Sequence, residues 1–191
     1  MSMRVLGVDY SIQSPGFCLH DSYSTTWWVK YFPKGKPFGD LSADVHLIPY
    51  PDVEGTERYI GLAAFGRSIL DMGNVDMVVM EDYAFGANGR ITQLAENGGT
   101  FKAMLHTYFK TIPLRVVAPS TLKKFATGNG RAQKEDVWTA FVAERPDAAL
   151  WPKQLFPKSR TNKILSPLSD IADSYYLAKY GQHLAAKPHA N

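Results

Sequence analysis

The chain has 191 residues, of which 45% are hydrophobic and 20% charged, and it carries a formal net charge of +3 at pH 7 with a pI near 8.9. These values suit a single globular domain over residues 1–191 and exclude a low-complexity chain. A mildly basic chain permits a nucleic-acid partner without requiring one.

The chain offers no side chains for a disulfide or for a thiolate-based zinc site. Cys18 is the only cysteine, and the five histidines show no metal-ligand spacing. No apolar stretch is long enough to span a bilayer, and no signal peptide precedes the first apolar run. We therefore expect an intracellular protein without a membrane partner.

Six segments have the apolar, β-branched or aromatic composition of β-strands. In chain order they are 3–9, 17–20, 25–32, 45–48, 75–80 and 113–118. The segment 45–48 is only a candidate strand, whereas the near-continuous apolar run 75–80 is typical of a strand covered on both faces.

Helical segments alternate with the later strands. They are 55–72, which Gly73-Asn74 ends, then 90–110, 120–125, 134–144 and a last helix from Ser166 with Pro167 in its first position. Residues 146–163 are expected to be irregular, and the tail after about residue 182 to be flexible. The order β-β-β-α-β-α-β-α-α predicts an α/β fold.

Four carboxylates stand where a sheet and a helix could bring them together. Asp9 and Glu81 each end an apolar strand, so both reach the rim of a sheet. Asp170 and Asp173 are three residues apart, which puts them on one face of a helix. Such charges would repel one another strongly, and a divalent metal ion is the natural remedy. Each acid alone also fits a plainer role, as a turn former, a solvated strand end or a partner of the helix dipole.

Four motifs occur in a fixed order along the chain. They are Gly7-Val8-Asp9, Val78-Val79-Met80-Glu81, the basic segment 128–134 and Asp170-Ile171-Ala172-Asp173-Ser174. Together they resemble the RuvC-like Holliday junction resolvases of the RNase H-like and retroviral integrase superfamily. The resemblance implies an RNase H-like fold, with a mixed five-stranded sheet of three antiparallel strands followed by parallel strands and flanked by helices.

The chain departs from that family in two places. Tyr10-Ser11 follows the first Asp, where family members commonly have Pro-Gly, and the segment 21–55 is longer than in the compact bacterial enzymes. These departures point to a viral or otherwise divergent member. The implied location is the cytoplasm, or the host cytoplasm for a viral protein.

The resemblance implies roles for five residues. Asp9, Glu81, Asp170 and Asp173 would form a catalytic tetrad that binds two Mg²⁺ ions per active site, for which Mn²⁺ can substitute, and Lys134 would lie beside the scissile phosphate. The implied activity is that of a crossover junction endodeoxyribonuclease in DNA recombination and repair, a hydrolase that cuts four-way junctions or related branched DNA.

Several other side chains are candidates for DNA contact. The basic ones are Lys123, Lys124, Arg131, Lys134, Lys158 and Arg160. Tyr83 and Phe85 follow Glu81, where the resemblance implies an aromatic side chain that stacks on a base. The alternatives are a solvated surface for any single lysine and core packing for the aromatic residues. Ser11 and Ser14 could bind phosphate, although hydrogen bonding within the turn explains them more simply.

Symmetric cleavage of a four-way junction needs two active sites, which predicts a homodimer. Its candidate interface is the helix 91–110, whose apolar pattern consists of Leu94, Phe101, Leu105 and Tyr108. Three other activities remain open on the same fold. They are a nuclease for RNA–DNA hybrids or for branched DNA with relaxed specificity, an actin-like nucleotide-binding regulatory domain, and a junction-binding protein without catalysis.

Overall fold

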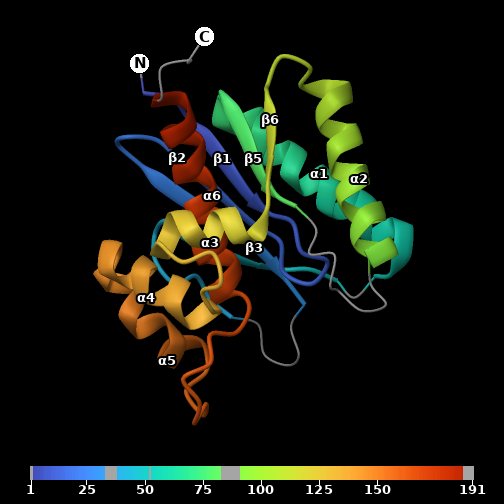
Figure 1. Ribbon diagram of the computed structural model, residues 1–191. Coiled ribbons are helices and arrows are strands. Elements are labelled where there is room, and N and C mark those ends of the chain that lie inside the picture. Colours follow the sequence, from blue (N-terminus) through green and yellow to red (C-terminus); the bar gives the residue numbers. More distant parts are fainter. Residues whose placement is uncertain (1, 33–37, 52, 83–90, 187–191) are drawn as a thin grey trace.

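A mixed β-sheet forms the centre of the computed structural model, which describes residues 2–32, 38–51, 53–82 and 91–186 (Figure 1). Within these residues the sheet has six strands in the order β4-β3-β2-β1-β5-β6. The strands are β1 (Val5–Asp9), β2 (Gly16–His20), β3 (Thr25–Tyr31), β4 (Val45–Pro49), β5 (Met77–Glu81) and β6 (Leu114–Val117). The pairs β1–β2 and β2–β3 are antiparallel, and β5 and β6 continue from β1 as parallel strands.

The expected mixed sheet is therefore confirmed, but the expected number of five strands is wrong by one. Both 17–20 and 45–49 are strands, and β4 pairs parallel to β3 at the edge of the sheet, with Val29 opposite Leu47. Val45 and Leu47 point into the core while His46 and Ile48 alternate with them. This alternation gives the segment a buried face, which is why it joins the sheet.

Helices cover both faces of the sheet (Figure 1). They are α1 (Gly55–Gly73), α2 (Ile91–Tyr108), α3 (Pro119–Thr127), α4 (Lys134–Glu144), the 3₁₀ helix η1 (Pro146–Leu150), α5 (Trp151–Leu155) and α6 (Leu168–Ala186). Along β1 the side chains alternate between two cores. Val5 packs with α6 and α4, and Leu6 packs with α1 and α2. Among the described helices, none combines the length and apolar character that crossing a membrane requires.

The segment 146–163 is less irregular than expected, because η1 and α5 occupy its first ten residues. Pro146 and Pro152 lie in the first turns of these helices, where proline is tolerated. Trp151 is 2% exposed and packs against Phe141 of α4 at a ring-centroid distance of 6.0 Å. Tertiary packing of this tryptophan therefore holds a segment whose composition suggested a loop.

The last helix begins two residues later than expected. It starts at Leu168 rather than Ser166, after a turn in which the Leu168 amide donates to the Leu165 carbonyl, and it ends at Ala186.

Two of the four residues in the apolar stripe of α2 are buried in the core and are not available for the expected dimer interface. Phe101 is 0% exposed and Leu105 is 3% exposed, and both pack in the core formed with α1 and the sheet. Phe101 stacks on Tyr10 at a centroid distance of 4.7 Å. Leu94 is half-buried and Tyr108 exposed, so only these two of the four residues retain surface for a partner.

Glycines allow α6 to lie directly on the sheet. A Cβ atom on Gly7 would overlap the backbone of Ser174 and Ala178, and one on Gly16 would overlap the carbonyl group of Asp170. On Gly181 of α6, a Cβ atom would crowd Val5 and Val79. The close approach of helix and sheet thus requires residues without a side chain.

We expect Gly7→Ala to destabilise the protein by about 3 kcal/mol or more, because neither backbone group above it can move without displacing α6. The measurement is the free energy of unfolding by urea. Gly99→Ala is the matched control, since Gly99 lies in α2 with no atom within 4 Å of its added Cβ. The control should be neutral or stabilise by up to about 1 kcal/mol. Equal stability of the two variants would contradict the importance of this contact.

Candidate active site

Asp9 and Glu81 lie side by side at the carboxyl ends of two neighbouring central strands. Asp9 ends β1 and Glu81 ends β5, and the parallel register pairs Val8 with Met80 one residue earlier. Both strands are buried over four residues up to this point because helices cover both faces. The apolar strands thus carry the two acids to the rim, as the sequence predicts.

Helix α6 brings the other two carboxylates to the same place. Asp170 lies in its first turn and is 4% exposed, and Asp173 follows one turn later, partly buried. The backbone of Asp170 lies against Gly16, the first residue of β2. The packing of α6 on β1 and β2 therefore sets the position of both acids.

The pKa values show that the four acids form one electrostatic cluster. Burial raises the pKa of Asp9 well above its usual range, and the charges of Asp170, Glu81 and Asp173 raise it further, as does a hydrogen bond with Asp170. Burial, followed by the charge of Asp173, raises the pKa of Glu81 to about 8. Burial and the charge of Asp170 raise that of Asp173 to about 7. Near neutral pH, Glu81 and Asp173 therefore hold protons that isolated carboxyl groups would lose.

Two lysines face this cluster. The charges of Lys123 and Lys134 partly offset the upward shifts in the pKa values of Glu81 and Asp173. Lys134 is the first residue of α4, and its Nζ donates to Ser169 Oγ at 3.3 Å. Reciprocal hydrogen bonds between Gln133 and Asp136 cap this helix start and so fix where Lys134 leaves the backbone. The sequence predicts Lys134 beside the phosphate and Lys123 as a DNA contact, and the charges of both lysines act on the carboxylate cluster.

The remaining candidates for DNA contact lie farther along the surface. Lys124 is exposed on α3, and Arg131 is exposed in the turn before α4. Lys158 and Arg160 are exposed in the segment after α5. Their exposure is compatible with phosphate contact. The two aromatic candidates, Tyr83 and Phe85, lie outside the described residues.

Ser14 is a site residue whose role the sequence did not reveal. It is 4% exposed, and its Oγ donates a hydrogen bond of 2.5 Å to Asp170 Oδ2, across 156 residues of sequence. Its neighbour Ser11 makes the expected turn contact, accepting from the Ser14 amide at 2.9 Å. The turn interpretation therefore holds for Ser11, whereas the Ser14 hydroxyl orients a carboxylate. The only hint of this role in the sequence was the position of Ser14, two residues before the start of β2.

The donor set fits a hard divalent cation. All four acids offer oxygen ligands, which Mg²⁺ prefers, and the raised pKa values of Asp9, Glu81 and Asp173 indicate that the cluster has too little positive charge nearby. In this arrangement, however, no group of three or more His, Cys, Asp or Glu side chains among the described residues is placed so that it could hold a metal ion. The Asp170 carboxyl group is instead engaged by Ser14 and Asp9. Protons and a hydroxyl group therefore occupy oxygens that a cation could use.

The raised pKa values predict that stability falls as pH rises in a chelating buffer. Glu81 and Asp173 change from usual values of 4.5 and 3.8 to about 8 and about 7 in the folded protein. Between about pH 4 and pH 8 the folded state thus binds more protons than the unfolded state, so the free energy of unfolding decreases over this window. At pH 8, Asp173→Asn should raise Tm by at least about 2–4 °C, which corresponds to about 1 kcal/mol for a chain of this size.

At pH 4 the same substitution should change Tm little, because Asp173 is then protonated in the folded state. Thermal unfolding in EDTA at both values of pH is the measurement. The matched control is Asp71→Asn, since Asp71 pairs with Arg67 on the surface of α1 and its carboxylate is 56% exposed. A variant at position 173 that is less stable than the parent at pH 8 would contradict the electrostatic cluster.

Comparison with known proteins identifies the fold. No protein-family model and no curated protein sequence matches the chain. Solved structures do match over almost its whole length. Thermus thermophilus RuvC in complex with Holliday junction substrate has a TM-score of 0.61 at 17% identity, with 97% of this chain and 99% of that chain covered.

One eukaryotic structure and one viral structure are also similar to this chain. The yeast mitochondrial Holliday junction resolvase has a TM-score of 0.58 at 16% identity, with 96% of this chain and 79% of that chain covered. Fowlpox virus resolvase in complex with Holliday junction DNA has a TM-score of 0.52 at 15% identity, with 97% and 100% covered. The RNase H-like architecture expected from the motifs is therefore confirmed, and the chain has the fold of the RuvC-like Holliday junction resolvases.

Proposed function

We propose that this protein is a metal-dependent endonuclease that resolves four-way or related branched DNA. The observation that carries the proposal is the meeting of Asp9, Glu81, Asp170 and Asp173 in one electrostatic cluster with two lysines beside it. A regulatory or purely structural domain gains nothing from four mutually repelling acids. The similarity in fold to three junction resolvases supports the choice of substrate.

The four acids would hold two Mg²⁺ ions, or Mn²⁺ in their place. When bound, such ions supply an activated water and neutralise charge that develops on a phosphate. Asp9 lies at the centre of the cluster, since all three other acids affect its pKa, and it is our candidate for the ligand shared by both ions. Glu81 and Asp170 would complete opposite sides, with Asp173 as a further ligand or as the group that orients water.

The chain's own cations and hydroxyl groups complete the site. Lys134 is held by Ser169 at the start of α4, and it would place positive charge against the phosphate as the transition state forms. Lys123 would share this role, because its charge also reaches Glu81 and Asp173. Ser14 would fix the rotamer of Asp170 and so limit the ways in which that acid can bind.

Paired cuts in a four-way junction need two such sites, so we propose a homodimer. With Phe101 and Leu105 used in the core, the exposed side of α2 offers Leu94 and Tyr108 to a partner. Tyr108 is 58% exposed, and the Arg67 guanidinium stacks on it at 3.9 Å from the ring centroid. Mass measurement of the protein with a bound junction tests this assembly, and a single protomer per junction would contradict it.

Asp9→Asn should lower the rate of junction cleavage by at least about 10³-fold, which is about 4 kcal/mol of transition-state stabilisation. Junction binding should remain, because removing one negative charge does not weaken attraction to phosphate. The assay is cleavage of a labelled four-way junction in Mg²⁺ together with a binding measurement. Asp71→Asn should cut like the parent. If the Asp9→Asn variant cut junctions at the rate of the parental protein, the proposed active site would be wrong.

Substrate comparison separates the related activities. The parental protein should cut four-way junctions in preference to flaps, RNA–DNA hybrids and linear duplex. Preferred cutting of hybrids would favour the RNase H-like alternative, and equal cutting of linear duplex would contradict a resolvase. Binding without any cutting in Mg²⁺ or Mn²⁺ would favour the non-catalytic alternative.

Lys134→Ala should lower cleavage by about 10²-fold, as expected for the loss of one charge aimed at the reacting phosphate. The matched control is Lys124→Ala, which removes an exposed lysine from α3 and should change cleavage by no more than about threefold. Single-turnover rates at saturating protein distinguish the two, because they exclude differences in binding. Equal rates for both variants would assign Lys134 to the general phosphate-contacting surface.

A further inference from the structure

An aromatic cavity of about 680 Å³ lies next to the carboxylates. It is enclosed by the turn between β1 and β2, the end of β3, the residues around β4, and the segment between α5 and α6. Five of its twelve lining residues are aromatic, namely Tyr31, Phe32, Phe38, Tyr50 and Phe156. The longer segment 21–55 noted in the sequence supplies four of these five rings.

The rings are already held in place by one another. Phe38 lies at a centroid distance of 5.0 Å from Tyr31 and 5.8 Å from Phe156, and Phe32 meets Tyr50 edge-on at 5.5 Å. The Phe38 amide also donates to the Tyr31 hydroxyl oxygen at 2.6 Å. A ligand that enters this cavity therefore loses little free energy in ordering its walls.

The cavity is joined directly to the carboxylate cluster. Ser14 lines the cavity, and its hydroxyl group donates a hydrogen bond to the Asp170 carboxylate. Ser166 and Pro167 line it as well and stand immediately before α6, the helix that carries Asp170 and Asp173. A group bound here would lie beside the reacting phosphate rather than at a remote surface.

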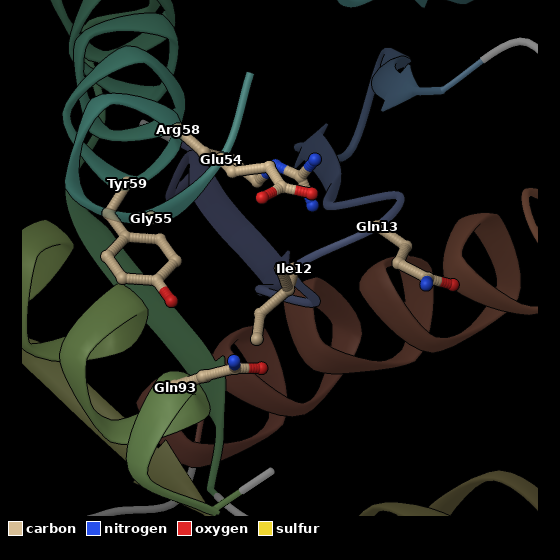
Figure 2. A pocket seen from close by; sticks show the side chains of 7 residues that line it. All are labelled: Ile12, Gln13, Glu54, Gly55, Arg58, Tyr59 and Gln93. Carbon is tan, nitrogen blue, oxygen red and sulfur yellow. The ribbon is translucent and has the colours of Figure 1, made fainter. Parts of the chain in front are cut away.

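A second cavity, of about 470 Å³, shares the lining residues Gln13 and Arg58 with the first (Figure 2). Its wall is formed by Ile12 of the β1–β2 turn and by Tyr59 of α1, with Gln93 of α2 below them (Figure 2). Glu54 contributes a negative charge there, and Tyr59 is its one ring. This second cavity lacks the stacked walls of the first and is not a comparable site for a flat aromatic ligand.

We propose that the aromatic cavity accepts one unpaired nucleobase of the strand whose phosphate lies at the carboxylates. This inference rests on the proposed function. Every base has a flat π face that stacks on aromatic rings, and the exposed Gln13 amide can both donate to and accept from a base edge. A base at a branch point is displaced from its stack at lower cost than one in duplex DNA. The cavity would thus couple the DNA shape to the choice of phosphate.

The test removes bases instead of phosphates. Four-way junctions that each carry one abasic position near the branch are bound to Asp9→Asn protein in Mg²⁺, so that affinity is measured without cutting. One position should show a loss of affinity of roughly 5- to 100-fold, the range for one base–aromatic stack. In a protein that also carries Phe156→Ala, the same abasic position should have no effect.

Two further variants show whether a lost abasic effect comes from the cavity itself or from misfolding of the Phe156→Ala protein. Leu165→Trp fills the cavity from its rim, where Leu165 is 44% exposed, and it should abolish the same abasic effect without removing a wall. Tyr23→Ala removes a ring that is 90% exposed in the turn between β2 and β3, and it should preserve the effect. Thermal unfolding confirms that each variant is folded.

Failure of this inference can be told from failure of the proposed function. If the protein cuts junctions but no abasic position matters, or if the effect survives Phe156→Ala and Leu165→Trp, the base cavity is refuted and the nuclease remains. If the protein shows no preference for junctions, the proposed function fails. The same abasic series in a single-stranded oligonucleotide then tests the cavity, and equal affinity throughout that series overturns it.

Discussion

The contact between α6 and the central strands is the constraint on which the rest of the structure depends. Gly7 and Gly16 leave no side chain between strand and helix, so the helix backbone rests on the sheet itself. Any larger residue would lift α6 and with it both Asp170 and Asp173. Packing densities of protein interiors leave no slack to absorb such a shift. The geometry of the acids is thus set by backbone contact, which is stiffer than contact between flexible side chains.

This arrangement concentrates charge at a cost in stability. Burial is the first cause of the raised pKa values at Asp9, Glu81 and Asp173, and mutual repulsion adds to it. Lys123 and Lys134 relieve the repulsion only in part. A cluster of this kind is costly to hold without a cation, and the same property would give it affinity for one. On the proposed function, stability without metal and affinity for metal would therefore be opposed in this fold.

Local sequence patterns predicted those parts whose structure is decided locally. The strands that end in Asp9 and Glu81 were visible as apolar runs, and α4 has its expected bounds of 134–144. Long-range packing decided the rest. The apolar pattern of α2 could not show whether Phe101 faces a partner or its own core, and nothing near Ser14 indicates a partner 156 residues away. Trp151 likewise belongs to a helix that its own segment did not indicate, and it packs on Phe141 of the preceding helix α4.

The order of the elements along the chain has a consequence for synthesis. The central strand β1 is made well before α6, the helix that covers one of its faces. Until α6 has emerged, the site has only two of its four acids, and Val5 and Val79 lack the cover of this helix. Long-range contacts of this kind form late and leave apolar surface exposed in the meantime. A growing chain should therefore need protection from aggregation until α6 has been made.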